Sequence, residues 1–197
     1  MEILVPKQGK RYVEGDMFDS RAPLVFSIHG VMTPDECGEM IARIEAEGPT
    51  AAPITTAAGF VMRPDIRNNT RVMFDDPALA ARLFQRIAKT VPAQLRERAP
   101  VGVNERFRCY RYEPGQRFAP HYDGAFQRSA TERSELTFMV YLNEGFGGGQ
   151  TAFLEFGRRV QPRVGSALLF QHMLFHEGCT VTEGVKYVLR SDVMYAD

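Results

Sequence analysis

The sequence lacks most features of secreted, membrane-bound or nucleic-acid-binding proteins. Its three cysteines show no CxxC spacing, which argues against disulfides and a zinc–thiolate site. Its 24 basic and 24 acidic residues balance, which argues against general polyanion binding but not against one specific contact. No apolar run approaches the length of a membrane span, and the N-terminal residues lack the apolar core of a signal peptide. We therefore expect a cytoplasmic protein with no membrane or nucleic-acid partner.

Two helices are predicted in the first half. Thr33-Pro34-Asp35-Glu36 forms a capping box with proline at the first helical position, and this helix should end near Gly48-Pro49. A second helix should start at Asp76-Pro77. Its apolar stripe comprises Leu79, Leu83, Ile87 and Val91. Residues 49–71 show little periodicity and predict a long loop, of the kind that often serves as a binding loop or lid.

The second half is rich in short strand-like runs. They are separated by turn signals and cover residues 104–112, 117–122, 135–142, 150–156, 164–170 and 185–195. At 197 residues the chain should form one domain. We predict a mainly β, α+β fold in which helices pack on one face of a β-sandwich or barrel.

His121 and Asp123 are the first candidate site residues. Residues i and i+2 of a strand point to one face, so both side chains can hold one metal ion. An HxD pair alone is weak evidence, and a structural pair is its ordinary interpretation. Here a strand, a turn and a second strand precede it, which should place the pair at the mouth of the fold. A histidine from a distant strand would complete the 2-His-1-carboxylate triad of non-haem iron oxygenases.

Two histidines could supply that third ligand. We favour His176, because a Glu177-Gly178 turn follows it and the next strand carries Lys186. His172 has no such context, and its alternative interpretation is a hydrogen-bonded structural histidine. We also expect His29 to be structural.

Lys186 and Arg190 lie four residues apart, on one face of the last predicted strand. A buried cation needs a partner. For Lys186 it could be the distal carboxylate of a dicarboxylic cosubstrate, unless the lysine is simply solvated at a sheet edge. For Arg190 we expect an Asp or Glu of a neighbouring strand. Tyr141, which shares a strand face with Thr137, could add a hydroxyl contact to the cosubstrate or pack in the core.

These motifs together resemble the Fe(II)- and 2-oxoglutarate-dependent dioxygenases, specifically their prolyl 4-hydroxylase-like branch. The matching motifs follow in order: Tyr112-x-Pro114-Gly115-x-x-Phe118-x-Pro120-His121-x-Asp123, then Tyr141-Leu142-Asn143, Gly148-Gly149-Gln150-Thr151-Ala152-Phe153, Pro162-x-x-Gly165-x-Ala167-Leu168-x-Phe170, His176-Glu177-Gly178 and Gly184-x-Lys186-Tyr187. The resemblance covers roughly residues 104 to 195, and a His-to-Lys gap of ten is typical of this branch.

The resemblance implies a double-stranded β-helix, or jelly-roll, in residues 101–197, supported by helices and a substrate loop in residues 1–100. It implies that Fe(II) is held by the two histidines and the aspartate named above. Lys186 would bind the 2-oxoglutarate C5 carboxylate, with Tyr141 as its hydrogen-bonding partner. Three further residues would line the cosubstrate pocket, the last as a weaker candidate: Tyr112, Phe118 and Thr151. Asp123 distinguishes the chain from halogenases of this superfamily, which lack that carboxylate.

The implied reaction consumes O2 and 2-oxoglutarate, hydroxylates a substrate C–H bond and releases succinate and CO2. Ascorbate as a reductant is an expectation from the family. The substrate would be a protein residue of the prolyl type or a small metabolite. The alternative from another class is a non-catalytic, cupin-like binding module, which would have no need for Lys186 at that spacing.

Substrate contacts are predicted in the polar segment 67–71. Clustered Arg67, Asn69 and Arg71 could contact a carboxylate, a phosphate or a peptide backbone, and an ordinary solvated loop is the equal alternative. Arg108 and Tyr110 share a strand face with Tyr112 and should look into the barrel. None of these residues identifies the substrate.

Overall fold

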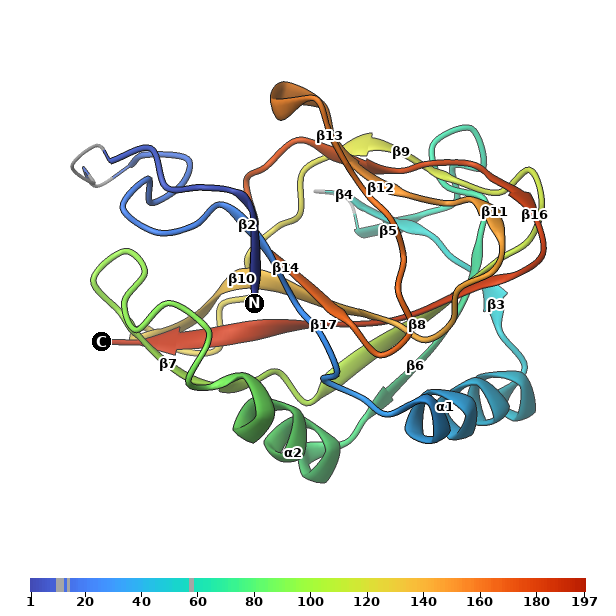
Figure 1. Ribbon diagram of the computed structural model, residues 1–197, viewed down its shortest axis with the longest axis horizontal. Coiled ribbons are helices and arrows are strands. Elements are labelled where there is room, and N and C mark those ends of the chain that lie inside the picture. Colours follow the sequence, from blue (N-terminus) through green and yellow to red (C-terminus); the bar gives the residue numbers. More distant parts are fainter. Residues whose placement is uncertain (10–12, 14, 57–58) are drawn as a thin grey trace.

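The computed structural model describes residues 1–9, 13, 15–56 and 59–197, and Figure 1 shows their arrangement. Within these residues, nine antiparallel strands form the major sheet in the order β1-β2-β14-β10-β17-β8-β6-β3, with β7 also paired to β17. Their bounds are β1 Glu2–Val5, β2 Val25–Ile28, β3 Thr50–Ala51, β6 Thr70–Asp75, β7 Ala99–Val103, β8 Arg106–Tyr112, β10 Glu132–Tyr141, β14 Ala167–Gln171 and β17 Lys186–Ala196.

A smaller sheet faces the major one, in the order β13-β12-β15-β9 (Figure 1). It comprises β13 Arg158–Val160, β12 Thr151–Phe153, β15 His176–Gly178 and β9 Phe118–His121. Two short pairs complete the described strands: β11 Gly147–Gly148 with β16 Val181–Glu183, and β4 Ile54–Thr56 with β5 Gly59–Val61. The mainly β jelly-roll prediction is confirmed.

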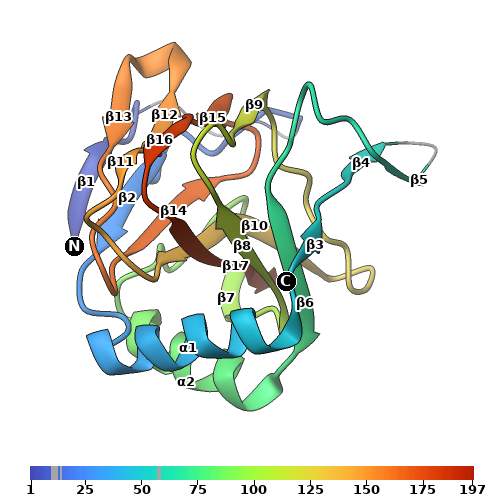
Figure 2. The ribbon, with the colours of Figure 1, turned by 90° about the vertical axis from the view of Figure 1, so that its right-hand side faces the viewer.

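Both predicted helices are confirmed and lie under the major sheet (Figures 1 and 2). Helix α1 (Pro34–Glu47) begins with the predicted capping box, in which Thr33 Oγ1 accepts from Glu36 N at 3.1 Å and Glu36 Oε2 accepts from Thr33 N at 2.8 Å. Helix α2 (Pro77–Ile87) is capped by Asp76. The predicted stripe was too long, because Val91 lies beyond the end of α2, although it is buried.

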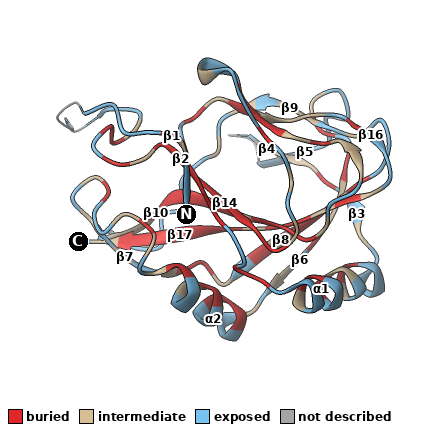
Figure 3. Cartoon of the chain, in the orientation of Figure 1, coloured by how far each residue is buried: buried red, intermediate tan, exposed pale blue. Residues whose placement is uncertain are grey.

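Strand β10 shows how one sheet serves two environments. Leu136, Phe138 and Val140 belong to the core shared with the helices, while Tyr141 packs in the second core, inside the barrel. Because both faces are covered, the second half of β10, residues 136–141, reads as an almost continuous apolar run. Figure 3 shows this burial in the central strands and on the inner faces of the helices. Among the described helices, none has the length and apolarity that crossing a bilayer requires.

The first hundred residues contribute more strands than predicted. β1, β2, β3 and β6 all join the major sheet, and residues 49–71 hold the β4–β5 hairpin rather than a plain loop. These strands are two to six residues long, which is too short for periodicity to reveal them. The predicted strand 150–156 is also shorter, because a 3-10 turn follows β12 at Leu154–Phe156. The division of the domain at residue 100 stays a prediction.

Gly165 joins the barrel to the segment before α1. Its carbonyl accepts from the backbone N–H groups of Val31 and Met32 at 2.8 and 3.1 Å. Its φ of +70° lies in the left-handed region, and a Cβ at this position would overlap the Met32 carbonyl.

We expect Gly165→Ala to lower the free energy of unfolding by roughly 1–3 kcal/mol or more, because it adds backbone strain and a clash with backbone. Urea denaturation of the variant measures this change. Gly102→Ala is the matched control, since a Cβ there would meet no atom within 4 Å. Equal losses in both variants would contradict the assignment.

Candidate active site

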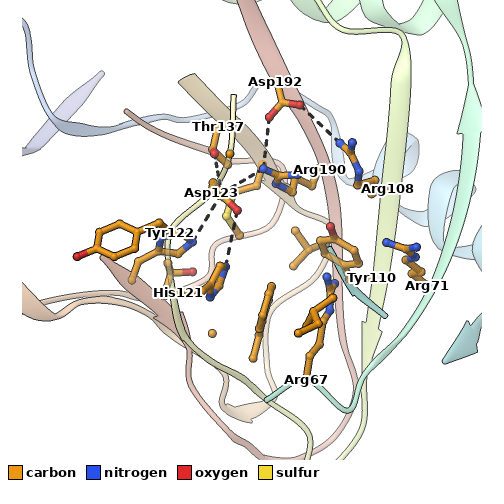
Figure 4. Close-up of a pocket in the computed structure, with 18 of the residues that line it drawn as sticks. Arg67, Arg71, Arg108, Tyr110, His121, Tyr122, Asp123, Thr137, Arg190 and Asp192 are labelled. Carbon is orange, nitrogen blue, oxygen red and sulfur yellow. Dashed lines mark hydrogen bonds and ion pairs between the residues drawn. The ribbon is translucent and has the colours of Figure 1, made fainter. Parts of the chain in front are cut away.

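Three potential metal ligands converge between the two sheets. His121 ends β9 and pairs in register with His176, which begins β15, while Asp123 follows β9 by two residues. One ligand atom from each side chain can be chosen so that all three lie within 4.8 Å of one another. His121 Nε2 is 3.7 Å from Asp123 Oδ1 (Figure 4). His176 Nε2 is 3.7 Å from Asp123 Oδ2.

Backbone carbonyls orient both imidazoles. His121 Nδ1 lies 2.8 Å from the Ala119 carbonyl and His176 Nδ1 lies 2.8 Å from the Leu174 carbonyl, so each Nδ1 carries the donated proton. The Nε2 lone pairs are left facing the carboxylate. Burial, together with the nearby His176, lowers the pKa of His121 to about 4, and burial also lowers the pKa of His176. Neutral imidazoles with free Nε2 atoms are the form that binds divalent metals, so this donor set fits Fe(II).

The Asp123 carboxylate is held through one oxygen. Oδ2 accepts from the Thr137 hydroxyl at 2.7 Å and lies 3.1 Å from Arg190 Nη2. Burial alone would raise the pKa of Asp123, but the charge of Arg190 and the hydrogen bond from Thr137 help to hold it well below its usual range. The carboxylate is therefore ionised, as a metal ligand must be.

His172, the alternative ligand, instead supports Asp123. Its Nδ1 lies 3.1 Å from Thr137 Oγ1 and its Nε2 lies 2.8 Å from Ser134 Oγ. Because the Thr137 proton goes to Asp123, His172 Nδ1 must donate to Thr137 and its Nε2 must accept from Ser134. This tautomer is neutral, in agreement with a pKa that burial lowers to about 4. The structural interpretation of His172 is correct, and His29 likewise contacts Ser166 Oγ at 3.1 Å.

Lys186 is a buried cation without an acidic partner in the described part of the chain. Its side chain is 2% exposed, and its ammonium donates to the Gly149 carbonyl at 2.6 Å. The rings of Tyr112 and Tyr141 have their centroids 5.2 and 5.6 Å away. Burial lowers the pKa of Lys186 to about 8. Since burying an unpaired charge is costly, this geometry suits an anionic ligand.

Most other predicted pocket residues line the same cavity, whose volume is about 700 Å³. Tyr112, Phe118 and Thr151 contribute to its wall, and Phe118 stacks on His121 with ring centroids 3.5 Å apart. Tyr141 is fully buried, and its hydroxyl lies 2.8 Å from Thr151 Oγ1, so its link to the cavity runs through that threonine.

The predicted substrate segment also reaches this cavity. Arg67, Arg71 and Tyr110 line it, whereas Asn69 is buried and accepts from Arg67 Nε at 2.8 Å. Asn69 therefore holds Arg67 in place. The alternative interpretation of this segment as an ordinary solvated loop is wrong at Arg67 and Asn69, because these residues are only 5% and 1% exposed.

Two features of the site were not predicted. Arg190 does not pair with a carboxylate of a neighbouring strand; it contacts Asp123 after β9 and Asp192 of its own strand, at 3.1 and 3.3 Å. The support of Asp123 by Thr137 and His172 was also missed. The alternation Thr137-Met139-Tyr141 was the available signal, because it places Thr137 on the barrel face.

Comparison with known proteins agrees with this geometry. The family model described as the 2OG-Fe(II) oxygenase superfamily matches residues 107–191. Prolyl 4-hydroxylase 1 of Arabidopsis thaliana is 25% identical over 195 residues, covering 85% of this chain and 68% of the relative. Prolyl 4-hydroxylase subunit alpha-2 of Gallus gallus is 26% identical over 201 residues, covering 90% of this chain and 35% of the relative.

Solved structures share the fold. A viral collagen prolyl hydroxylase from Paramecium Bursaria Chlorella virus-1, in complex with 2OG, has a TM-score of 0.60 at 20% identity and covers 88% of this chain and 97% of its own. A prolyl hydroxylase from Trichoplax adhaerens, in complex with a peptide fragment of hypoxia inducible factor, has a TM-score of 0.64 at 16% identity, covering 88% and 83%. The chain is thus similar in sequence to the 2OG-Fe(II) oxygenase superfamily and to prolyl 4-hydroxylases, and it shares the fold of solved prolyl hydroxylases.

Proposed function

We propose that His121, Asp123 and His176 hold Fe(II) in this dioxygenase and that Lys186 binds the C5 carboxylate of 2-oxoglutarate. The observation that carries the proposal is the pairing of two features in one cavity. Two neutral imidazoles present free Nε2 atoms to an ionised carboxylate, and a buried lysine without an acidic partner lies on the wall. A dicarboxylate can reach from the metal site to Lys186, and its far carboxylate then provides the negative partner of the buried ammonium group.

Each residue has a distinct task in the reaction. Bound Fe(II) and 2-oxoglutarate supply the oxidising chemistry with O2, and succinate and CO2 leave. Lys186 fixes the far end of the cosubstrate as a point charge, while Thr151, backed by Tyr141, offers a hydroxyl on the same wall. Phe118 covers one face of His121 and shields it from water. Thr137 and Arg190 keep the second Asp123 oxygen engaged.

For the substrate, we propose a prolyl-type residue of a peptide. The relatives that support this are named prolyl 4-hydroxylases, and the Trichoplax structure holds a peptide fragment. The β4–β5 hairpin projects from the body of the molecule (Figure 2). Ile54, at its start, lines the cavity. Phe60 and Met62 on this segment are 69% and 50% exposed, as suits a surface that a peptide covers.

We also propose that the protein works in a reducing compartment, the cytoplasm, with ascorbate as a reductant. Cys37, Cys109 and Cys179 are all free thiols.

An anaerobic titration with Fe(II) and then 2-oxoglutarate tests the proposed ligands. We expect the visible charge-transfer band of the iron–cosubstrate complex with the wild type, a weaker band with Lys186→Ala, and none with His121→Ala. Arg158→Gln, an exposed change in β13, is the control and should keep the full band. A full band with His121→Ala would overturn the assignment.

The lowered pKa of Lys186 predicts a pH dependence. The charged ammonium binds a carboxylate, and it is lost as pH rises through about 8. We expect kcat/KM for 2-oxoglutarate to fall above about pH 8 in the wild type. Lys186→Arg should extend the plateau to higher pH, because arginine stays charged. A decline at the same pH in both enzymes would place its cause elsewhere.

Thr137 provides a test of how Asp123 is held. Thr137→Val removes the hydroxyl that donates to Asp123 and leaves His172 Nδ1 without its acceptor, so we expect metal affinity to fall roughly 10–100-fold. Thr137→Ser keeps the hydroxyl and should retain most of the affinity. Anaerobic metal titration measures both, and equal affinities of the two variants would refute this role.

A further inference from the structure

The cavity carries more positive charge than its proposed iron and cosubstrate require. Among the described residues that line it there are five cationic side chains and two carboxylates: Arg67, Arg71, Arg108, Lys186 and Arg190 against Asp123 and Asp192. The whole chain has no net charge, so this excess is local. Fe(II) and the 2-oxoglutarate dianion cancel each other, and their binding leaves the excess unchanged.

The cations occupy two separate positions on the sheet. In the pairing of β17 with β8, Lys186 lies opposite Tyr112 and Arg190 lies opposite Arg108. Four residues of extended strand separate Lys186 from Arg190, which is about 13 Å along β17. Lys186 thus stands alone at one end. The other four cations gather around Tyr110, which Arg71 faces from β6. We call Arg67, Arg71 and Arg108 the arginine cluster.

The arginine cluster is short of acidic partners. Arg190 uses Asp123 and Asp192, and Arg108 has only a 3.5 Å approach to Asp192, which Arg190 shares. Within the described part of the chain, neither Arg67 nor Arg71 forms an ion pair with a carboxylate. Arg67 Nη2 and Arg108 Nη1 are buried without a hydrogen-bond partner. A buried N–H group without an acceptor lowers the stability of the folded protein, unless a ligand accepts its hydrogen bond.

Aromatic stacking does not remove that need. The Arg67 guanidinium lies 4.3 Å from the ring centroid of Tyr110 and 4.4 Å from that of Phe118. These rings cover its faces and fix its position. Nε already donates to Asn69, but Nη2 stays free to donate in the guanidinium plane. Stacking therefore presents Arg67 as a preoriented donor beside Phe118, which itself stacks on His121.

The pKa of the Tyr110 phenol reflects the positive charge of the surrounding arginines. Burial alone would raise its pKa, yet the charges of Arg67, Arg190 and Arg108 lower it below the ordinary value. A negative group placed next to Tyr110 would be stabilised for the same reason.

We infer that the substrate of this enzyme carries a carboxylate that docks on the arginine cluster while its target carbon faces the metal site. A carboxylate accepts two parallel N–H bonds from a guanidinium, which suits the open edges of Arg67 and Arg108. The carboxylate can belong to a free amino acid or to an acidic residue beside the target proline. This inference rests on the proposed function, because it identifies the substrate class of the same site.

The test measures binding of four probes to the protein loaded anaerobically with Fe(II) and 2-oxoglutarate. Three are blocked pentapeptides that differ only in the two residues beside a central proline, which are glutamate, glutamine or lysine; the fourth is free L-proline. Isothermal titration calorimetry at low salt gives each Kd. We expect the glutamate peptide or free proline to bind at least about tenfold more tightly than the glutamine peptide. Which of the two wins identifies the source of the carboxylate.

A charge reversal separates recognition from a structural role. Arg71→Glu, at a half-buried position, should lose the preference for glutamate and bind the lysine peptide more tightly than the wild type does. Arg158→Gln, at an exposed position that is not among the lining residues of the cavity, should keep the wild-type preference. Equal affinity for the glutamate and glutamine peptides, tightest binding of the lysine peptide by the wild type, or binding of none of the four probes would overturn the inference. Absence of the charge-transfer band when the wild-type protein is loaded with Fe(II) and 2-oxoglutarate would instead refute the proposed function.

Discussion

The Asp123 carboxylate is the point on which the site depends. Its side chain faces two imidazoles and is only 12% exposed. Its charge survives there because Arg190 and the Thr137 hydroxyl compensate for the lost water. The two histidines reach it only because β9 and β15 pair in register, with His121 opposite His176. A shift of one residue in that pairing would turn one imidazole to the other face of the small sheet.

The major sheet tolerates this charged interior because its other face is apolar. Along β10 and β17, alternate side chains enter the helix-covered core and the barrel; Thr137, for example, stands between the buried Leu136 and Phe138. The helices thus stabilise the strands that present Thr137, Lys186 and Arg190. The cations that lack a full set of acidic partners, Lys186 and the arginine cluster, still lower the stability of the fold. They also make the cavity selective for anionic groups.

Much of this site could be predicted from residue patterns, and the reason is local geometry. Lys186 and Arg190 lie four residues apart on β17 and therefore share a face, and the structure places both on the cavity. His121 and Asp123 line the same cavity, as their i, i+2 spacing predicted, although Asp123 lies beyond the end of β9. The capped starts of α1 and α2 were equally visible, because caps depend on neighbouring residues. The strands of the first hundred residues were not, since strands such as β2 and β3 are too short to show a period and are defined by their partners.

The sequence by itself determined the ligand types, their order and the strand faces, because side-chain direction along a strand follows from backbone geometry alone. Only the tertiary structure decided which histidine faces Asp123 and which supports it through Thr137, since both follow the same strand and differ in their distant neighbours. It also decided that Arg67, Arg71 and Arg108 converge on one cavity. Their convergence depends on the pairing of β6 with β8 and of β8 with β17, and long-range pairing is a property of the whole fold.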